Sequence, residues 1–216
     1  MNVLVVGANG KIGKQIVKLL QEEGTQVWAM VRKEEQAKSF EEKGIQTKLA
    51  DLEDSVESLK AVLDEMDAVV FTAGSGGSTG ADKTLLIDLD GAVKVMEAAE
   101  QAGVKRYVMI SAFQANDREN WSEAIKPYYV AKHYADKLLT LSNLDYTIIR
   151  PGGLLDELGT GRIRWGEAIE PGSIPREDVA KTVVAVLPEK ATYRKSFDLT
   201  SGNTPIEDAV KKMTEE

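Results

Sequence analysis

Short apolar runs rich in β-branched residues alternate with stretches of helical periodicity along the whole chain of 216 residues. The apolar runs predict strands, and the periodic stretches predict helices between them. The predicted strands cover residues 2–6, 26–31, 45–49, 68–72, 106–111, 145–150 and 196–200. The predicted helices cover residues 11–23, 34–43, 55–65, 81–102, 127–141, 176–187 and 206–214. This alternation indicates an α/β fold with a doubly wound parallel sheet and helices on both faces.

Two segments lack either pattern. A glycine- and serine-rich stretch, residues 74–80, follows the fourth predicted strand, and a longer stretch of about residues 152–175 follows the sixth. In an open α/β sheet, ligands bind beyond the carboxyl ends of the strands, where both segments begin. We therefore expect one domain over residues 1–216, with residues 152–175 as an irregular, small substrate-side addition.

Three glycines follow the first predicted strand and open the first helix. In the G-x-x-G-x-x-G spacing, Gly7 would permit a tight turn, Gly10 would give a phosphate access to the backbone, and Gly13 would let the helix pack closely. A dinucleotide would then lie at the helix N-terminus, beside Asn9, Lys11 and Ile12. No G-K-[ST] sequence follows, which excludes a P-loop. The alternative is that the glycines serve packing alone.

The end of the second strand carries information on cofactor choice. About 20 residues after the glycines, where an acidic residue would bind the ribose 2′-hydroxyl of NAD, the chain has Arg32 and Lys33. Cations there suit the 2′-phosphate of NADP, and Lys11 adds a third cation on the same side. We therefore predict NADP (NADPH) as the cofactor. Alternatively, Arg32 and Lys33 belong to a surface loop.

The residues after the third strand allow two interpretations. Asp51 would accept a hydrogen bond from the adenine amino group while Leu52 covers the ring face. Aspartate is also a good helix N-cap, so Asp51 is equally explained as the cap of the next helix.

Tyr128 and Lys132 are spaced by one helical turn. An i,i+4 pair shares one helix face, and an adjacent ammonium favours the phenolate, which would bring a tyrosine into useful acid/base range. The pair follows a strand ending at Ser111, whose hydroxyl would hold a substrate carbonyl. A tyrosine packed on a lysine stem is the alternative explanation.

These motifs together resemble the short-chain dehydrogenase/reductase superfamily. The glycine spacing and the sequence Arg150-Pro151-Gly152-Gly153 point to its extended and atypical branches, which include proteins called NAD(P)-dependent epimerase/dehydratase or NAD(P)H-binding. The resemblance runs from Gly7 to Ala180 and implies a Rossmann-type fold. It implies that Tyr128 transfers the proton, that Lys132 holds the nicotinamide ribose and tunes Tyr128, and that Ser111 orients the substrate oxygen.

The resemblance also implies positions for the rest of the cofactor. The adenosine would pass Thr72, Ala73 and Gly74, and the nicotinamide would pass Pro151, Gly152, Gly153 and Leu154. The family's helical asparagine corresponds to Asp88 here. An ionised aspartate accepts hydrogen bonds but cannot donate them, so the proton relay through this position differs. Asp88 would pair with Lys132 or be a solvated helix residue.

Composition narrows the function classes. The net charge of −8 and a pI near 4.9 argue against nucleic-acid binding. The chain has no cysteine and one histidine, His133, which makes a metal site improbable. The first strand starts at residue 2 without a basic leader, and no apolar run approaches the ~20 residues of a membrane span. We expect a cytoplasmic protein, a monomer or homodimer, with an unknown small-molecule substrate and no nucleic-acid or membrane partner.

The leading hypothesis is an NADP-dependent oxidoreductase or epimerase-like enzyme that transfers hydride to or from a small carbonyl or alcohol. The short chain beyond Pro151 leaves a small pocket, which argues against nucleotide sugars. The alternatives are an NADP(H)-binding sensor without turnover and a small reductase of flavin or another planar acceptor. His133 is expected to be a packed residue, while Trp121 and Trp165 either line the pocket or shield the core edge.

Overall fold

A mostly parallel sheet with helices on both faces forms the molecule. The computed structural model describes residues 1–213. Within them, one nine-stranded sheet has the strand order β11-β8-β10-β6-β5-β4-β1-β2-β3. Its strands are β1 (Asn2–Val6), β2 (Gln26–Val31), β3 (Gln46–Leu49), β4 (Ala68–Phe71), β5 (Arg106–Ile110), β6 (Asp145–Pro151), β8 (Arg162–Gly166), β10 (Lys195–Ser201) and β11 (Thr204–Pro205). Only β8 and β11 introduce antiparallel pairs among these strands.

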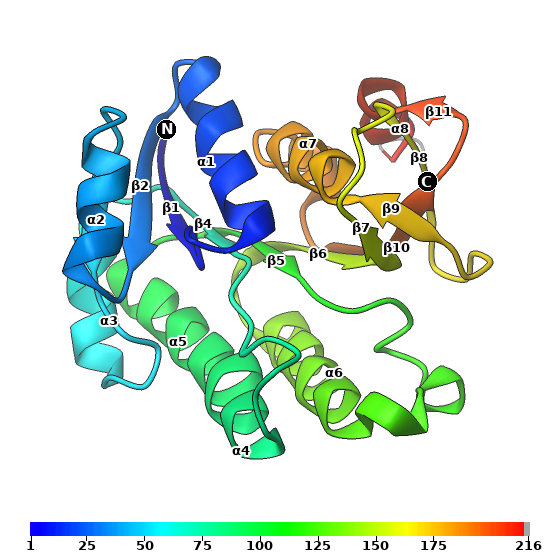
Figure 1. Cartoon of the computed structure of the whole chain (residues 1–216), viewed down its shortest axis with the longest axis horizontal. Coiled ribbons are helices and arrows are strands. Elements are labelled where there is room, and N and C mark those ends of the chain that lie inside the picture. Colours follow the sequence, from blue (N-terminus) through cyan, green and yellow to red (C-terminus); the bar gives the residue numbers. More distant parts are fainter. Residues whose placement is uncertain (214–216) are drawn as a thin grey trace.

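Helices cover both faces of this sheet (Figure 1), and an apolar core lies on each face. One core packs the sheet against α1 (Lys11–Glu22), α2 (Glu34–Glu41), α7 (Arg176–Val186) and α8 (Ile206–Lys212). The other packs it against α3 (Val56–Val62), α5 (Ala92–Ala102) and α6 (Lys126–Leu141). The central strands are apolar on both faces because both faces are covered, as Val3 to Val6 of β1 illustrate with fully buried side chains. The predicted Rossmann-type, doubly wound α/β fold is confirmed.

The helix predicted over residues 81–102 is wrong in its interior. It consists of a short helix α4 (Ala81–Lys83), a π-helical segment over Thr84–Gly91, and α5. The wider turn carries Asp88 and packs against α6. Such π-helical insertions often occur at functional sites. The other predicted helices begin and end within three residues of the observed ones, apart from Thr214, which lies outside the described residues.

The sequence predicted an irregular segment over about residues 152–175, but this segment contains three short strands. It contains β7 (Gly153–Leu155) and β9 (Ser173–Pro175), which pair in parallel as a separate two-stranded sheet, and also β8. β8 pairs antiparallel with β10, which lies some thirty residues further along the chain. These strands are short, and they form by hydrogen bonding to strands that are distant in the chain. Local periodicity of the sequence therefore does not reveal them.

A buried arginine anchors the C-terminal half to the sheet. Arg106 of β5 donates hydrogen bonds to the carbonyl oxygens of Val186 (2.7 Å) and Leu187 (2.9 Å), where α7 ends. It also donates to the carbonyl oxygen of Asp145 at 2.8 Å. Burial lowers the pKa of Arg106 to about 10, and the guanidinium therefore stays charged at neutral pH. The side chain thus satisfies helix-terminal carbonyls that would otherwise be buried without a donor.

We expect Arg106→Met to lower the free energy of unfolding by about 2–3 kcal/mol, because carbonyl groups at the end of α7 lose a charged donor. Urea unfolding followed by circular dichroism measures this change. The control is Arg194→Met, since the exposed Arg194 makes one side-chain hydrogen bond of 3.3 Å in the described structure, to Ser142. A loss for Arg106→Met no larger than for Arg194→Met would show that these carbonyls do not need the arginine.

Candidate active site

The turn between β1 and α1 is closed too tightly for side chains. Gly7 has φ +82°, and a Cβ there would lie 2.6 Å from the backbone nitrogen of Ala73, just after the neighbouring strand β4. A Cβ on Gly13 would collide with the carbonyl oxygen of Gly7 and the backbone of Ala8. The predicted role of Gly7 in the turn is confirmed. Gly13 lets the first turn of α1 fold against the loop itself.

The N-terminus of α1 is open toward the carboxyl end of the sheet. Gly10 is the N-cap residue and provides no side-chain cap, and the first turn contains no acidic residue. Backbone N–H groups of this turn are therefore available to an anion, which the helix dipole also favours. Ile12 is buried below the turn, while Asn9 and Gly10 line the cavity in front of it.

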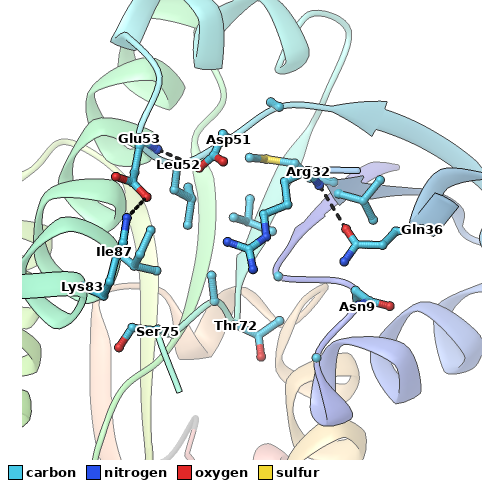
Figure 2. Close-up of a pocket in the computed structure, with 18 of the residues that line it drawn as sticks. Asn9, Arg32, Gln36, Asp51, Leu52, Glu53, Thr72, Ser75, Lys83 and Ile87 are labelled. Atoms are coloured by element: carbon cyan, nitrogen blue, oxygen red, sulfur yellow. Dashed lines mark hydrogen bonds and ion pairs between the residues drawn. The ribbon is translucent and has the colours of Figure 1, made fainter. Parts of the chain in front are cut away.

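A cavity of about 520 Å³ lies at the carboxyl ends of β1, β2 and β4 (Figure 2). It brings together most of the residues predicted for the adenosine half of a dinucleotide. These are Gly7, Asn9, Gly10, Arg32, Asp51, Leu52, Thr72, Ala73 and Gly74. Sequence reasoning missed Gln36 and the ion pair between Glu53 and Lys83 (2.5 Å), which lie at the same cavity.

Arg32 extends from the end of β2 into this cavity (Figure 2). Its backbone N–H donates to Gln36 Oε1 at 3.3 Å, whereas its guanidinium has no hydrogen-bond or ion-pair partner within residues 1–213. Of the three predicted cations, Arg32 alone lines the cavity. Lys33 pairs with Glu35 at 3.6 Å, and Lys11 pairs with Asp156 at 2.6 Å.

The two interpretations of Asp51 are now separated. The N-cap of α3 is Ser55, whose hydroxyl accepts the Ser58 N–H at 3.2 Å, so the N-cap interpretation of Asp51 is wrong. Asp51 instead accepts the N–H of Glu53 at 3.1 Å in a local turn, a common use of aspartate. Both Asp51 and the buried Leu52 line the cavity, as the adenine interpretation requires.

A second cavity of about 870 Å³ adjoins the first along Thr72 to Ser75. It brings together the four predicted catalytic residues from three segments of the chain: Asp88 from the π-helical segment, Ser111 from the loop after β5, and Tyr128 and Lys132 from α6. Pro151, Gly152, Gly153 and Leu154 form another wall, as predicted for the nicotinamide side. The candidate active site therefore has two adjoining halves at the carboxyl edge of the sheet.

Lys132 and Tyr128 do not behave as the sequence predicted. Lys132 is 1% exposed and donates to the carbonyl oxygen of Ile110 at 2.9 Å. Burial lowers the pKa of Lys132, although Asp88 and Asp136 oppose this effect. The pKa of Tyr128 is raised, first by burial and then by Asp88, Asp136 and Tyr129. The expected lowering of the Tyr128 pKa by Lys132 is therefore wrong, because burial and carboxylates dominate its surroundings.

Asp88 fits neither interpretation from the sequence. It is 1% exposed and forms no ion pair with Lys132 among the described residues, so it is neither solvated nor paired. Its Oδ2 accepts the Ser75 N–H at 3.0 Å. A Cβ on Gly74 would lie 2.9 Å from Asp88 Oδ1, so the glycine allows this close approach. Asp88 thus holds the segment that forms the wall between the two cavities.

Ser111 presents an unused hydroxyl to the second cavity. The residue is 3% exposed, and its Oγ has no hydrogen-bond partner in the part of the chain that the structure describes. A buried hydroxyl without a partner carries a free-energy cost of about 1–3 kcal/mol. A substrate oxygen in the cavity would remove that cost.

A buried ionic network below the cavity was missed by sequence reasoning. Arg150 Nε donates to Asp136 Oδ2 at 2.7 Å, and both side chains are almost fully buried. Asp198 accepts the Gln114 N–H at 3.0 Å, and burial raises the pKa of its carboxyl. The sequence did contain a signal for part of this network. Tyr128, Lys132 and Asp136 are spaced at i, i+4 and i+8, which places them on one face of α6.

The remaining candidates have packing roles. His133 Nδ1 lies 2.8 Å from the carbonyl oxygen of Ala115, which confirms it as a packed residue. Trp121 does not line either cavity but stacks against Tyr129, with ring centroids 6.0 Å apart. Trp165 packs against the core. No group of three potential metal ligands exists within residues 1–213, and no helix there has the length and apolar composition needed to cross a bilayer.

The open N-terminus of α1 and the two adjoining cavities have room and donors for a dinucleotide, and the sequence match agrees with this. The model of a family described as NAD(P)H-binding matches residues 7–190, from the first glycine past the end of α7. The chain belongs to this NAD(P)H-binding family. The match spans both cavities and most of the fold that carries them.

Relatives of this NAD(P)H-binding protein support the assignment. A Bacillus subtilis protein named the uncharacterized sugar epimerase YhfK is 58% identical over 99% of this chain and all of its own length. A Bacillus halodurans structure, named after the NAD-dependent epimerases/dehydratases, is 41% identical with a TM-score of 0.93 and covers 98% of this chain and 99% of that one. The Lactococcus lactis oxidoreductase YlbE is 34% identical with a TM-score of 0.90, covering 100% and 98%.

Proposed function

We propose that this NAD(P)H-binding protein is an NADP(H)-dependent oxidoreductase of the atypical short-chain dehydrogenase/reductase type. The observation that carries the proposal is the pair of adjoining cavities. One holds the unpartnered guanidinium of Arg32, and the other holds the unpartnered hydroxyl of Ser111 beside Tyr128 and Lys132. A single extended ligand would reach both halves, since they share Thr72 to Ser75.

The residues of the first cavity fit NADP(H). Arg32 offers a planar, unpaired guanidinium that suits the 2′-phosphate, and no acidic side chain replaces it at the end of β2. The open N-terminus of α1 suits the pyrophosphate, since Gly10 leaves the backbone accessible. Asp51 and Leu52 suit the polar edge and the face of adenine.

The second cavity supplies the groups for carbonyl chemistry. When bound, the dinucleotide supplies a hydride at nicotinamide C4 for a substrate carbonyl carbon. Ser111 Oγ orients the carbonyl oxygen, and Tyr128 donates a proton to that oxygen as an alcohol forms. The raised pKa of Tyr128 keeps the phenol neutral at pH 7, so this residue is prepared to act as an acid in the reductive direction.

We expect Arg32→Ala to raise the dissociation constant of NADPH roughly 10–100-fold, because a charge-assisted contact to the 2′-phosphate is lost. The dissociation constant of NADH should change less than about threefold, since NADH has no 2′-phosphate. Isothermal titration calorimetry of each cofactor measures both. Lys33→Ala is the matched control, because Lys33 neighbours Arg32 in sequence but does not line the cavity. Equal affinities of the unmodified protein for NADPH and NADH would contradict the NADP assignment.

A second candidate function is NADP(H) binding without turnover, as in a sensor. The observation that favours it is the position of Lys132, whose ammonium donates to Ile110 instead of supporting Tyr128. A third candidate is reduction of flavin or another planar acceptor, which the stacked Tyr129 and Trp121 would accommodate. NADPH oxidation with aromatic aldehydes that depends on Tyr128 favours the leading proposal over both.

We also propose a small-molecule substrate, a cytoplasmic location, no nucleic-acid or membrane partner, and a monomeric or homodimeric state. The acidic composition supports the absence of a nucleic-acid partner. Light scattering of the purified protein measures the oligomeric state.

A further inference from the structure

The second cavity offers almost no charge to a substrate. Asp88 and Lys132 are the only charged residues among its described lining residues, and both are engaged. Lys132 donates to the carbonyl oxygen of Ile110, and Asp88 accepts the N–H of Ser75. The first cavity differs, because Arg32 there is unpartnered. The two halves therefore suit ligands of different charge.

Cations next to the lining residues in sequence are also neutralised. Lys126, between the lining residues Ile125 and Pro127, pairs with Glu123 at 2.8 Å. Lys11, adjacent to Ile12, pairs with Asp156 at 2.6 Å, and Arg176 pairs with the same carboxylate at 2.7 Å. Each cation of this set therefore already has a carboxylate partner in the described structure.

Backbone donors on one wall of the second cavity are used as well. The N–H of Gly152 donates to Leu199 at 2.9 Å, and the N–H of Gly153 donates to Gly172 at 2.9 Å. These glycines therefore do not form an anion-binding nest, although glycine-rich backbone often does. A phosphorylated substrate would meet no unpaired cationic side chain among the described lining residues of this cavity, which is costly for a buried anion.

The walls of this cavity are apolar and partly aromatic. Apolar side chains and prolines dominate, namely Ile12, Phe113, Ile125, Pro127, Leu154 and Pro171. Tyr129 also lines the cavity, and Trp121 stacks behind it with an interplanar angle of 12°. Trp121 is itself fixed by a 3.3 Å hydrogen bond from its indole nitrogen to Ala115. A supported aromatic wall of this kind favours a planar ring in the ligand.

We propose that the substrate is an uncharged carbonyl compound with a planar unsaturated ring, which binds against Tyr129, and that phosphorylated sugars and sugar nucleotides are excluded. This inference rests on the proposed function. In the reaction, hydride adds to the carbonyl carbon, the carbonyl π bond breaks, and the oxygen takes a proton from Tyr128. With NADPH as the hydride donor, the products would be the alcohol, oxidised NADP and the Tyr128 phenolate, which would then take up a proton from water.

The prediction that the substrate is uncharged is tested with two aldehydes of similar shape, methyl para-formylbenzoate and para-carboxybenzaldehyde. We expect kcat/KM with NADPH to be at least about tenfold higher for the neutral ester, because the carboxylate has no free cation to meet. Calorimetric titration of methyl benzoate and benzoate onto the NADPH-loaded protein provides a readout independent of turnover. Ile125→Arg adds a cation to the wall and should reduce or reverse the preference.

The prediction that a planar ring binds against Tyr129 is tested by comparing the neutral aromatic aldehyde with cyclohexanecarbaldehyde. We expect Tyr129→Ala to raise KM for the aromatic aldehyde roughly threefold to tenfold and to change KM for the cyclohexyl aldehyde little. Leu138→Ala, on the exposed side of the same helix α6, is the control and should leave both values unchanged.

The outcomes separate this inference from the function on which it rests. Failure of NADPH to bind would overturn the proposed function itself. Binding of NADPH together with a preference for the carboxylate probe, or for glyceraldehyde 3-phosphate, would overturn the substrate class alone. Binding of NADPH with neither binding nor reduction of the neutral aromatic probes would also overturn it.

Discussion

Tyr128→Phe is expected to lower kcat for reduction of methyl para-formylbenzoate by roughly 10²–10⁴-fold, the range typical for loss of a positioned general acid. The phenyl ring keeps the packing of Tyr128, so NADPH affinity should stay within about twofold. Stopped-flow or steady-state absorbance of NADPH measures kcat, and calorimetry measures cofactor affinity. Tyr129→Phe is the control, because it removes a neighbouring phenol and keeps the aromatic wall.

The pH dependence adds a second readout of the same residue. Burial, Asp88 and Asp136 raise the pKa of Tyr128. The phenol therefore remains protonated at pH values above about 10, the ordinary pKa of tyrosine. We expect no loss of kcat in the reductive direction that titrates with Tyr128 between pH 7 and about pH 10. Unchanged turnover in Tyr128→Phe would remove this residue from the mechanism.

Arg150→Met is expected to lower the free energy of unfolding at pH 7 by about 3–5 kcal/mol, the range for removing one partner of a buried ion pair. Arg150 donates to Asp136 at 2.7 Å, and it also lowers the pKa of the buried Asp198 carboxyl. Without the guanidinium, the buried Asp136 carboxylate loses its ion-pair partner, and the Asp198 carboxyl loses a nearby positive charge. Urea unfolding of the purified variants measures the loss.

The double variant Arg150→Met, Asp136→Leu is the test of this explanation. Because it removes the unpaired carboxylate as well, it should recover a substantial part of the lost stability. Additive losses in the two single variants and the double variant would mean that the pair is not coupled. Leu141→Ala, at an exposed position of the same helix, controls for changes to α6.

The titration of Asp198 determines the direction in which the stability of the folded protein changes with pH. Burial raises the pKa of Asp198 in the folded protein above its value in the unfolded chain. The folded state therefore binds more protons between these two pKa values, and the Asp198 contribution to stability falls as pH rises through that window. In Arg150→Met the window should extend to higher pH, because the cation that lowers this pKa is gone.

The fold and most residues of the first cavity could be predicted because their signals are local. Each central strand is a continuous apolar run, since both faces of a parallel sheet are covered. The glycines at Gly7, Gly10 and Gly13 lie within one turn and report its steric demands directly. Arg32 directly follows β2 in the sequence. Because β1 and β2 are parallel neighbours, this position alone predicts that Arg32 lies at the carboxyl edge of the sheet, beside the glycine turn.

The ionisation of the site depends on contacts that sequence spacing does not contain. Tyr128 and Lys132 share a helix face as predicted, but Asp88 faces them from the π-helical segment, and Asp136 lies two turns along α6. Burial by the surrounding elements then moves both pKa values away from those of an exposed pair. The balance of desolvation against charge is a property of the assembled site.

The sequence by itself determined the α/β architecture, the glycine turn after β1 and the identity of the candidate catalytic groups, because apolar periodicity and glycine spacing act over one element at a time. The tertiary structure alone decided which of the three predicted cations lines the first cavity, because Glu35 and Asp156 pair with Lys33 and Lys11 while Arg32 has no partner among the described residues. It also decided that β7, β8 and β9 are strands, and that the second cavity is apolar. These features depend on partners that are distant in the chain, and only folding brings them together.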